Sequence, residues 1–110
     1  MPKKIKEKES DIQFAICQYL EWKHLDFWRQ NTTPIWDKSG KGFFRAMPKY
    51  AKKGVPDIFV MTPRRMIFLE VKRPKGVLSE DQVAFQEMCK RNGFEYYLVR
   101  SVEDVQEKIF

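Results

Sequence analysis

Three charged side chains in the second half of the sequence have the types and spacing needed for chemistry on phosphate esters. Asp57 closes the segment Gly-Val-Pro-Asp just as an apolar run begins, and Glu70 and Lys72 lie two residues apart at the end of the next run. Side chains two residues apart in a strand project from the same face. Carboxylate oxygens are hard ligands for Mg²⁺ or Mn²⁺, and a neighbouring ammonium group can orient an attacking water or offset charge on phosphorus. The pattern predicts a metal-assisted hydrolytic site.

A β-hairpin is the element that would bring these groups together. Residues 57–61 and 66–71 are apolar runs flanking Thr-Pro-Arg-Arg, which predicts two antiparallel strands. Because the start of one antiparallel strand lies beside the end of the other, Asp57 is expected to meet Glu70. The backbone carbonyl of Val71 is then also placed to face a metal ion.

The other elements are predicted from periodicity and from end signals. Apolar residues at helical spacing predict a helix over about 9–23. A capping box that starts at Ser79 predicts a second helix, and Gly93 provides its left-handed end. Shorter segments are expected to form strands at 26–31 and 96–99 and a last helix at 101–109. The stretch 32–54, with two prolines and three glycines, is expected to be mainly loop, with 42–45 as a candidate for a further strand. The expected fold class is α/β, a small central mixed sheet flanked by helices in the order α-β-β-β-α-β-α.

Length and composition exclude several classes of protein. The chain has 110 residues, 43% of them hydrophobic and 15% aromatic, which supports one folded domain over 1–110 with 1–8 as a charged lead-in. No apolar run approaches the roughly 20 residues of a membrane span, and no signal peptide is recognised. Cys17 and Cys89 fit no zinc-binding spacing, so we expect reduced, buried thiols in an intracellular protein with a cytoplasmic location.

Positive charge is concentrated in the first half of the chain. The formal net charge is +6, and all of this excess lies within residues 1–56. Basic side chains interleave with aromatic ones in a composition suited to phosphate contacts and base stacking. The candidate DNA-binding residues are Lys38, Lys41, Arg45, Lys49, Lys52 and Lys53, with Trp36, Phe43, Phe44 and Tyr50 among them and with Arg73 and Lys75 beyond the second hairpin strand. The alternative is a solvated loop whose aromatic side chains belong to the core. Arg29 is equally suited to pairing with a carboxylate or contacting phosphate.

The same residues resemble a known family. Pro56-Asp57 followed by Glu70-Val71-Lys72 resembles the signature of the PD-(D/E)XK nucleases, and more narrowly the chain resembles a VRR-NUC (virus-type replication-repair nuclease) domain. A bare PD…ExK pattern occurs by chance, whereas five segments in family order are specific. These segments are Glu9 with Gln13, Arg29-Gln30-Asn31-Thr32, Lys53-Gly54-Val55-Pro56-Asp57, Glu70-Val71-Lys72-Arg73-Pro74 and Leu78-Ser79-Glu80-Asp81-Gln82.

The resemblance implies a nuclease core fold and Mg²⁺- or Mn²⁺-dependent cleavage of DNA that leaves 3′-hydroxyl and 5′-phosphate ends. It implies that Asp57 and Glu70 are metal ligands and that Lys72 is the catalytic lysine. It also places Glu9 near the metal as the first-helix acid, and Gln82 at the site from the second helix. Small free-standing domains of this family resemble phage-type DNA repair enzymes, some of them dimeric Holliday-junction resolvases. The resemblance therefore implies a homodimer that acts on branched DNA in a bacterial or phage-infected cell.

Each of these residues also has a purely structural interpretation. Asp57 after Gly-Val-Pro could be a turn or cap residue, and Glu70 could form a simple ion pair with Lys72. Glu9 stands where helix dipoles favour acids, and the Ser-Asp-Ile-Gln segment that follows it is a possible capping box. Gln82 is the N3 residue of the second capping box and needs no role in catalysis.

Taken together, the sequence predicts a metal-dependent DNA endonuclease selective for branched DNA such as a Holliday junction. The main rival is a non-catalytic DNA-binding module with the same fold. Clustered carboxylates facing a polyanion would repel phosphate in the absence of a cation, which argues against that rival. A small basic protein that binds an acidic protein partner would leave Glu70-Val71-Lys72 unexplained.

Overall fold

A four-stranded mixed sheet forms the centre of the computed structural model, which describes residues 7–30 and 49–110. Its strands are β1 (Asp26–Arg29), β2 (Ile58–Thr62), β3 (Arg65–Val71) and β4 (Glu95–Val99), in the spatial order β1-β2-β3-β4. β2 pairs antiparallel with both β1 and β3, whereas β4 runs parallel to β3. The predicted hairpin and the predicted mixed sheet are both confirmed.

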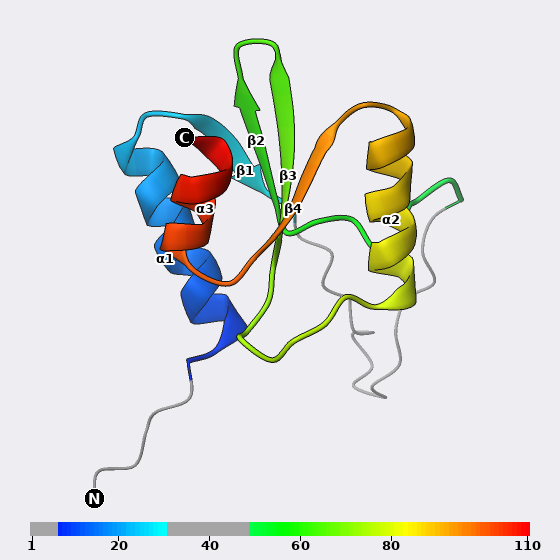
Figure 1. Ribbon diagram of the computed structural model, residues 1–110, viewed down its shortest axis with the longest axis horizontal. Coiled ribbons are helices and arrows are strands. Elements are labelled where there is room, and N and C mark those ends of the chain that lie inside the picture. Colours follow the sequence, from blue (N-terminus) through cyan, green and yellow to red (C-terminus); the bar gives the residue numbers. More distant parts are fainter. Residues whose placement is uncertain (1–6, 31–48) are drawn as a thin grey trace, which may run out of the picture.

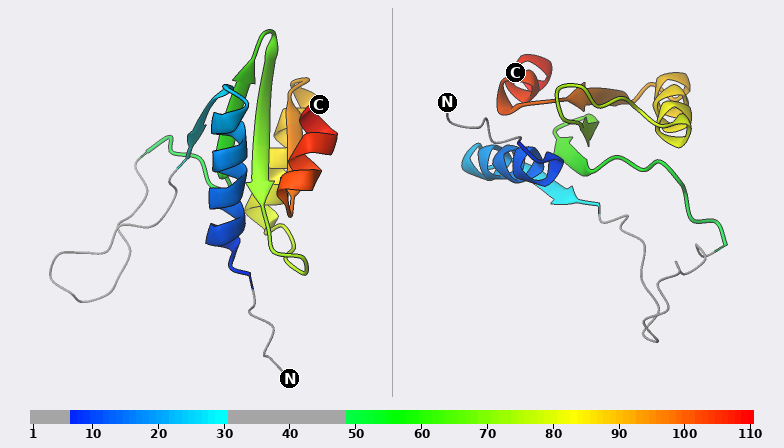
Figure 2. Two further views of the ribbon diagram at one scale, coloured as in Figure 1. Left: turned by 90° about the vertical axis from the view of Figure 1, so that its left-hand side faces the viewer. Right: turned by 90° about the horizontal axis from the view of Figure 1, so that it is seen from below.

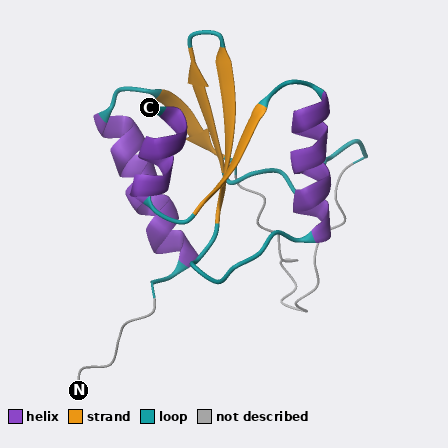
Figure 3. Cartoon of the chain, viewed as in Figure 1, coloured by secondary structure: helices purple, strands orange, loops and turns teal. Residues whose placement is uncertain are grey.

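Helices cover both faces of this sheet (Figure 1). α1 (Glu9–Trp22) and α3 (Val102–Ile109) pack together on one face, and α2 (Glu80–Arg91) covers the other. Figure 3 shows the same arrangement coloured by secondary structure. Among the described residues the chain order is α-β-β-β-α-β-α, as predicted.

β3 lies between two cores of different composition. Its aliphatic side chains are fully buried in the cluster formed with α1 and α3, and they are Ile67, Leu69 and Val71. Phe68 points to the opposite face, where the centre of its ring lies 5.5 Å from the centre of the Phe85 ring in α2. Because side chains alternate along a strand, Glu70 shares the aromatic face with Phe68. β3, which is covered on both faces, therefore contains a buried carboxylate.

Local hydrogen bonds explain where α2 begins and ends. The Ser79 hydroxyl accepts from the Gln82 N–H at 3.2 Å, and the Gln82 side-chain oxygen accepts from the Ser79 N–H at 2.8 Å. Gly93 follows the helix with φ of 76°, and the Phe94 N–H donates to the Cys89 carbonyl at 2.9 Å. These are the predicted capping box and left-handed helix end.

The beginning of α1 differs from one of the sequence interpretations. Lys8 is the N-cap residue, and its backbone N–H donates to the Asp11 carboxylate at 3.3 Å. Ser10 lies inside the helix, so the capping box considered for Ser-Asp-Ile-Gln is wrong. Gln13 therefore does not cap α1.

The predicted strand at 26–31 is assigned as Asp26–Arg29. Asn31, and the strand expected at 42–45, lie outside the described residues. Ser101 caps α3 as expected, since its hydroxyl accepts from the Asp104 N–H at 3.2 Å.

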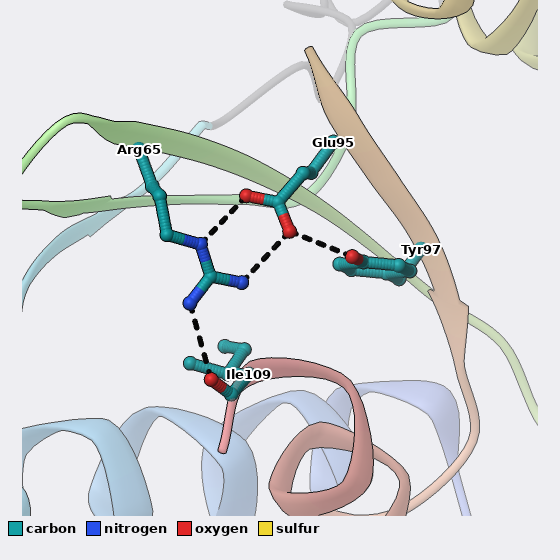
Figure 4. A network of polar contacts seen from close by, with 4 residues as sticks. All are labelled: Arg65, Glu95, Tyr97 and Ile109. Atoms are coloured by element: carbon teal, nitrogen blue, oxygen red, sulfur yellow. Dashed lines mark hydrogen bonds and ion pairs between the residues drawn. The ribbon is translucent and has the colours of Figure 1, made fainter.

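A polar network joins β3, β4 and the end of α3 (Figure 4). The Arg65 guanidinium donates to both carboxylate oxygens of Glu95 at 2.7 Å and to the Ile109 carbonyl at 3.2 Å. The Tyr97 hydroxyl donates to the same carboxylate at 2.7 Å. This network holds the C-terminal end of α3 against the sheet.

Cys17 and Cys89 are free thiols in α1 and α2, on opposite faces of the sheet. Burial raises the pKa of both thiols. Within the described parts of the chain, 7–30 and 49–110, the helices are too short or too polar to span a membrane.

Candidate metal centre

The β2–β3 hairpin places Asp57 and Glu70 side by side. Ile58 pairs with Leu69, so the next rung of the ladder joins Asp57 to Glu70 on the face that also carries Phe68. One carboxylate oxygen of Asp57 accepts a hydrogen bond from the Val71 N–H at 2.8 Å. The start of β2 is thereby held against the end of β3, as the sequence predicts for an antiparallel pair.

Glu9 joins this pair from a different element. It opens α1, one turn before Ile12, whose side chain is buried in the core with the sheet. Figure 2 shows the N-terminal end of α1 and the C-terminal end of β3 at the same end of the molecule. Carboxylate oxygens of Glu9, Asp57 and Glu70 lie within 4.8 Å of one another. Three acids that are far apart in the sequence therefore converge on one point.

Glu70 has the least favourable surroundings of the three. It is 1% exposed, and its Oε1 has no hydrogen-bond partner among the described residues. Burial, followed by the adjacent Asp57, raises the pKa of the Glu70 carboxyl to about 9; Glu9 adds to this rise and Lys72 opposes it. A divalent cation among the three carboxylates would offset both the desolvation and the mutual repulsion. The donor set therefore fits a hard cation such as Mg²⁺ or Mn²⁺.

Lys72 stands directly beyond the end of β3. Its backbone N–H donates to the Val99 carbonyl at 3.0 Å, which extends the β3–β4 ladder by one residue. The side chain is half-buried, two residues after Glu70 and thus on the same face. The ammonium lies close enough to Glu70 to oppose the rise in its pKa. In the described residues no ion pair joins Lys72 to Glu70, so the simple ion-pair interpretation is not supported.

Gln82 is engaged at the beginning of α2. Its side-chain oxygen is bound by the Ser79 N–H, and within the described segments no hydrogen bond connects Gln82 to the three carboxylates. The beginning of α2 is nevertheless close to the loop that precedes Asp57. A Cβ on Gly54 would lie 2.3 Å from the Asp81 carbonyl oxygen. The capping role of Gln82 is confirmed, and a role at the metal centre stays a prediction.

The predicted DNA-binding residues separate into two groups. Lys38, Lys41 and Arg45 lie outside the described residues, as do Trp36, Phe43 and Phe44. The described basic side chains of this set are exposed, and they are Arg29, Lys49, Lys52, Lys53, Arg73 and Lys75. Tyr50 is 91% exposed, with the Lys49 ammonium 5.1 Å from the centre of its ring. Tyr50 therefore does not belong to the core, which favours the binding interpretation at this position.

Arg29 is held by α1. Its Nε donates to the Gln13 side-chain oxygen at 2.6 Å, and Gln13 lies one helical turn after Glu9. Of the two roles considered for Arg29, pairing with a carboxylate is not observed among the described residues. The guanidinium instead binds Gln13 of α1 from β1, the strand at the edge of the sheet.

Two residues with a clear place in this region were not identified as such from the sequence. Gly54 was part of a matched segment, but its contact with α2 depends on tertiary structure. Arg100 donates hydrogen bonds to carbonyls of the loop that follows Lys72. An arginine between a strand and a helix N-cap has no local pattern that would reveal this contact.

Comparisons with known proteins support the fold. The family model of the VRR-NUC domain matches residues 2–103 of the chain. A solved structure described as a VRR-NUC domain is similar with a TM-score of 0.64 at 20% sequence identity, and the match covers 93% of this chain and 97% of that one. No curated protein matches the chain. The solved structure confirms the predicted nuclease-type fold.

Proposed function

Because the chain belongs to the VRR-NUC domain family, which has a nuclease-type fold, we propose that it is a metal-dependent endonuclease that hydrolyses phosphodiester bonds in DNA. The observation that carries the proposal is the convergence of Glu9, Asp57 and Glu70 within 4.8 Å. A module that only binds DNA has no need of three carboxylates at one point, since these would repel phosphate.

The residues of the site have distinct roles in this proposal. Glu9, Asp57 and Glu70 would hold Mg²⁺ or Mn²⁺. The Val71 carbonyl is a further candidate ligand, because the N–H and C=O of one strand residue point to the same side and the Val71 N–H faces Asp57. When bound, the cation would lower the pKa of a coordinated water and stabilise charge that develops on phosphorus.

The protein itself supplies position and charge. The Val71 N–H holds one oxygen of Asp57, and the other oxygen would then serve as the cation ligand. Lys72 brings an ammonium to the same face as Glu70, where it can orient the attacking water or offset charge on the scissile phosphate. The exposed basic residues would contact phosphates away from the reacting bond, which positions DNA without reading its sequence.

Cleavage assays with a lysine variant test this assignment. DNA is incubated with Mg²⁺, with Mn²⁺ and with EDTA, using the wild type, Lys72→Ala and the exposed α2 control Lys90→Ala. We expect EDTA to abolish cleavage and Lys72→Ala to lower the rate about a hundredfold or more, as for removal of a single group that stabilises a transition state. DNA binding by Lys72→Ala should persist, because the phosphate contacts lie elsewhere. Cleavage in EDTA, or an unchanged rate for Lys72→Ala, would contradict the proposal.

We further propose that the preferred substrate is branched DNA, with a four-way Holliday junction as the specific case. Symmetric cleavage of such a junction requires two active sites, and a C2 homodimer provides them. A panel of labelled single-stranded, linear, flap and four-way substrates, combined with sedimentation of the free protein, tests both statements. A monomer that cuts linear duplex as fast as junctions would refute them and leave the hydrolytic activity in place.

A further inference from the structure

The Arg100 side chain is bound to the loop that follows the end of β3. Its Nη1 donates to the carbonyls of Arg73, Pro74 and Gly76, at 3.0 Å for Pro74 and 2.8 Å for Gly76. These acceptors lie 24–27 residues earlier in the sequence. Hydrogen bonds from a charged donor are stronger than those between neutral groups. One guanidinium group therefore binds three carbonyls of the loop between β3 and α2.

The backbone of Arg100 is itself held in place by the elements on either side of it, β4 and α3. Its backbone N–H donates to the Asp104 carboxylate at 2.8 Å, and Asp104 belongs to the first turn of α3. The preceding residue, Val99, is fully buried in β4 and accepts a hydrogen bond from the Lys72 N–H at 3.0 Å. The guanidinium thus extends from a fixed point between β4 and α3.

The loop is in close contact with the base of Lys72. A Cβ on Gly76 would lie 3.3 Å from the Lys72 Cβ and 3.3 Å from the Arg73 carbonyl oxygen. The Gly76 N–H also donates to that carbonyl at 2.9 Å. The loop therefore folds back as a turn onto the first side-chain atom of Lys72, and the position of this turn limits where the lysine stem can go.

We propose that Arg100 is a positioning residue for Lys72: by bracing the turn over 73–76, it fixes the direction in which the lysine leaves the end of β3. This inference rests on the proposed role of Lys72 in hydrolysis. It assigns no contact with DNA or metal to Arg100. The carboxylates belong to α1, to the residue before β2 and to β3, all outside the turn over 73–76, so we expect the metal centre to persist without the brace.

Two substitutions at Arg100 and one control separate the brace from other effects. Arg100→Met keeps a long aliphatic side chain and removes the side-chain N–H donors, whereas Arg100→Lys restores a charged donor. Arg91→Met is the matched control. Arg91 is exposed in the last turn of α2, and its replacement removes the same charge.

The first measurement does not depend on nuclease activity. Trypsin cuts after lysine, and a loosened turn exposes the Lys75–Gly76 bond through local unfolding. Mass spectrometry of the fragment that begins at Gly76 gives the cleavage rate. We expect faster cleavage in Arg100→Met, partial recovery in Arg100→Lys and no change in Arg91→Met. An Arg100→Met rate equal to that of the wild type would overturn the brace.

The second measurement links the brace to the reaction. We expect kcat to fall by about tenfold to a hundredfold in Arg100→Met, the range for a displaced catalytic group, with a smaller change in KM and partial recovery in Arg100→Lys. The dissociation constant for Mn²⁺ should stay at the wild-type value.

A kcat no lower than that of Arg91→Met, or a weakened Mn²⁺ affinity, would overturn the positioning role. If the wild type itself does not cleave DNA, the proposed function fails, while the trypsin result still decides whether Arg100 braces the turn.

Discussion

Asp57 and Glu70 are neighbours that receive very different support from the protein. An oxygen of Asp57 is bound by the Val71 N–H. Glu70 is 1% exposed, and its Oε1 has no partner in the described part of the chain. A buried polar atom without a partner costs free energy, and a buried charge costs more. Of the two carboxylates, Glu70 is therefore the one that a bound cation would stabilise more.

Replacing Glu70 by glutamine tests this dependence. We expect Mn²⁺ to raise the unfolding free energy of the wild type by about 2.7 kcal/mol at a hundred times the dissociation constant. In Glu70→Gln this rise should disappear, because the variant lacks a charged ligand. In EDTA the variant should unfold at no lower temperature than the wild type, since glutamine has nearly the same shape and adds no charge to a buried site. Calorimetry with and without Mn²⁺ measures both effects.

Glu87→Gln is the control for this substitution. Glu87 is exposed in α2, so its loss should leave the Mn²⁺ effect intact. An equal Mn²⁺ effect in Glu70→Gln and in the wild type would show that Glu70 is not a ligand.

Glu95 provides a separate prediction on pH dependence. Hydrogen bonds from Arg65 lower the pKa of the Glu95 carboxyl. Its contribution to stability is therefore complete above the pKa of an unfolded glutamate, about 4.3, and is lost as the pH falls through the lower pKa of the folded state. Because the two side chains are 36% and 31% exposed, we expect Glu95→Gln to cost at most about 1 kcal/mol at pH 7. In urea denaturation the difference from the wild type should vanish toward strongly acidic pH. The exposed Glu107→Gln should show no such trend, and a difference that persists in acid would refute the assignment.

At the scale of elements, the site depends on how the loop before Asp57 meets α2. Gly54 has φ of 75°, and a Cβ there would lie 2.3 Å from the Asp81 carbonyl oxygen. Gly93 has nearly the same φ, 76°, but a Cβ there would meet nothing within 4 Å. The two glycines share a backbone conformation and differ in the space around them.

Alanine substitutions at these two glycines separate strain from close contact. Gly93→Ala should cost only the left-handed backbone strain, about 1–2 kcal/mol. Gly54→Ala should cost a further 1–3 kcal/mol or so, because α2 and the loop must move apart. Urea denaturation measures both values. We also expect weaker Mn²⁺ binding in Gly54→Ala alone, since Asp57 follows three residues later; equal losses of stability in the two variants would show that the close contact carries no energy.

The sequence predicts those elements whose signals are local. The hairpin follows from two apolar runs and a turn, and α2 follows from Ser79, Gln82 and Gly93, whose hydrogen bonds or dihedral angle act within a few residues. The convergence of Asp57 and Glu70 follows from strand pairing alone. The proximity of Glu9 was expected only from a family resemblance, because it depends on packing of α1 against the sheet. The Arg100 contacts span 24 residues or more, and no periodicity encodes such a distance.

At the scale of the whole molecule, charge and chemistry occupy different parts of the chain. The formal net charge of +6 lies in residues 1–56, whereas residues 57–110 are neutral and contain Asp57, Glu70 and Lys72. Lys52 and Lys53 stand where the two parts meet, and both are exposed. The adjacent Gly54 touches the beginning of α2. A duplex that contacts Lys52 and Lys53 would therefore lie beside the loop that leads into Asp57.

The double substitution Lys52→Ala with Lys53→Ala tests whether this pair contacts DNA. Each lost phosphate contact should lower the slope of log affinity against log salt by about 0.9, so the variant should bind more weakly and depend less on salt. Binding is measured without divalent cations, so that the DNA stays intact. Lys90→Ala with Arg91→Ala removes the same charge from the last turn of α2 and controls for net charge alone. If both double variants lose the same affinity and slope, the effect is one of overall charge. A loss confined to the Lys52 and Lys53 variant places the phosphate backbone beside the loop that leads into Asp57, because the control removes the same charge from α2 without that loss.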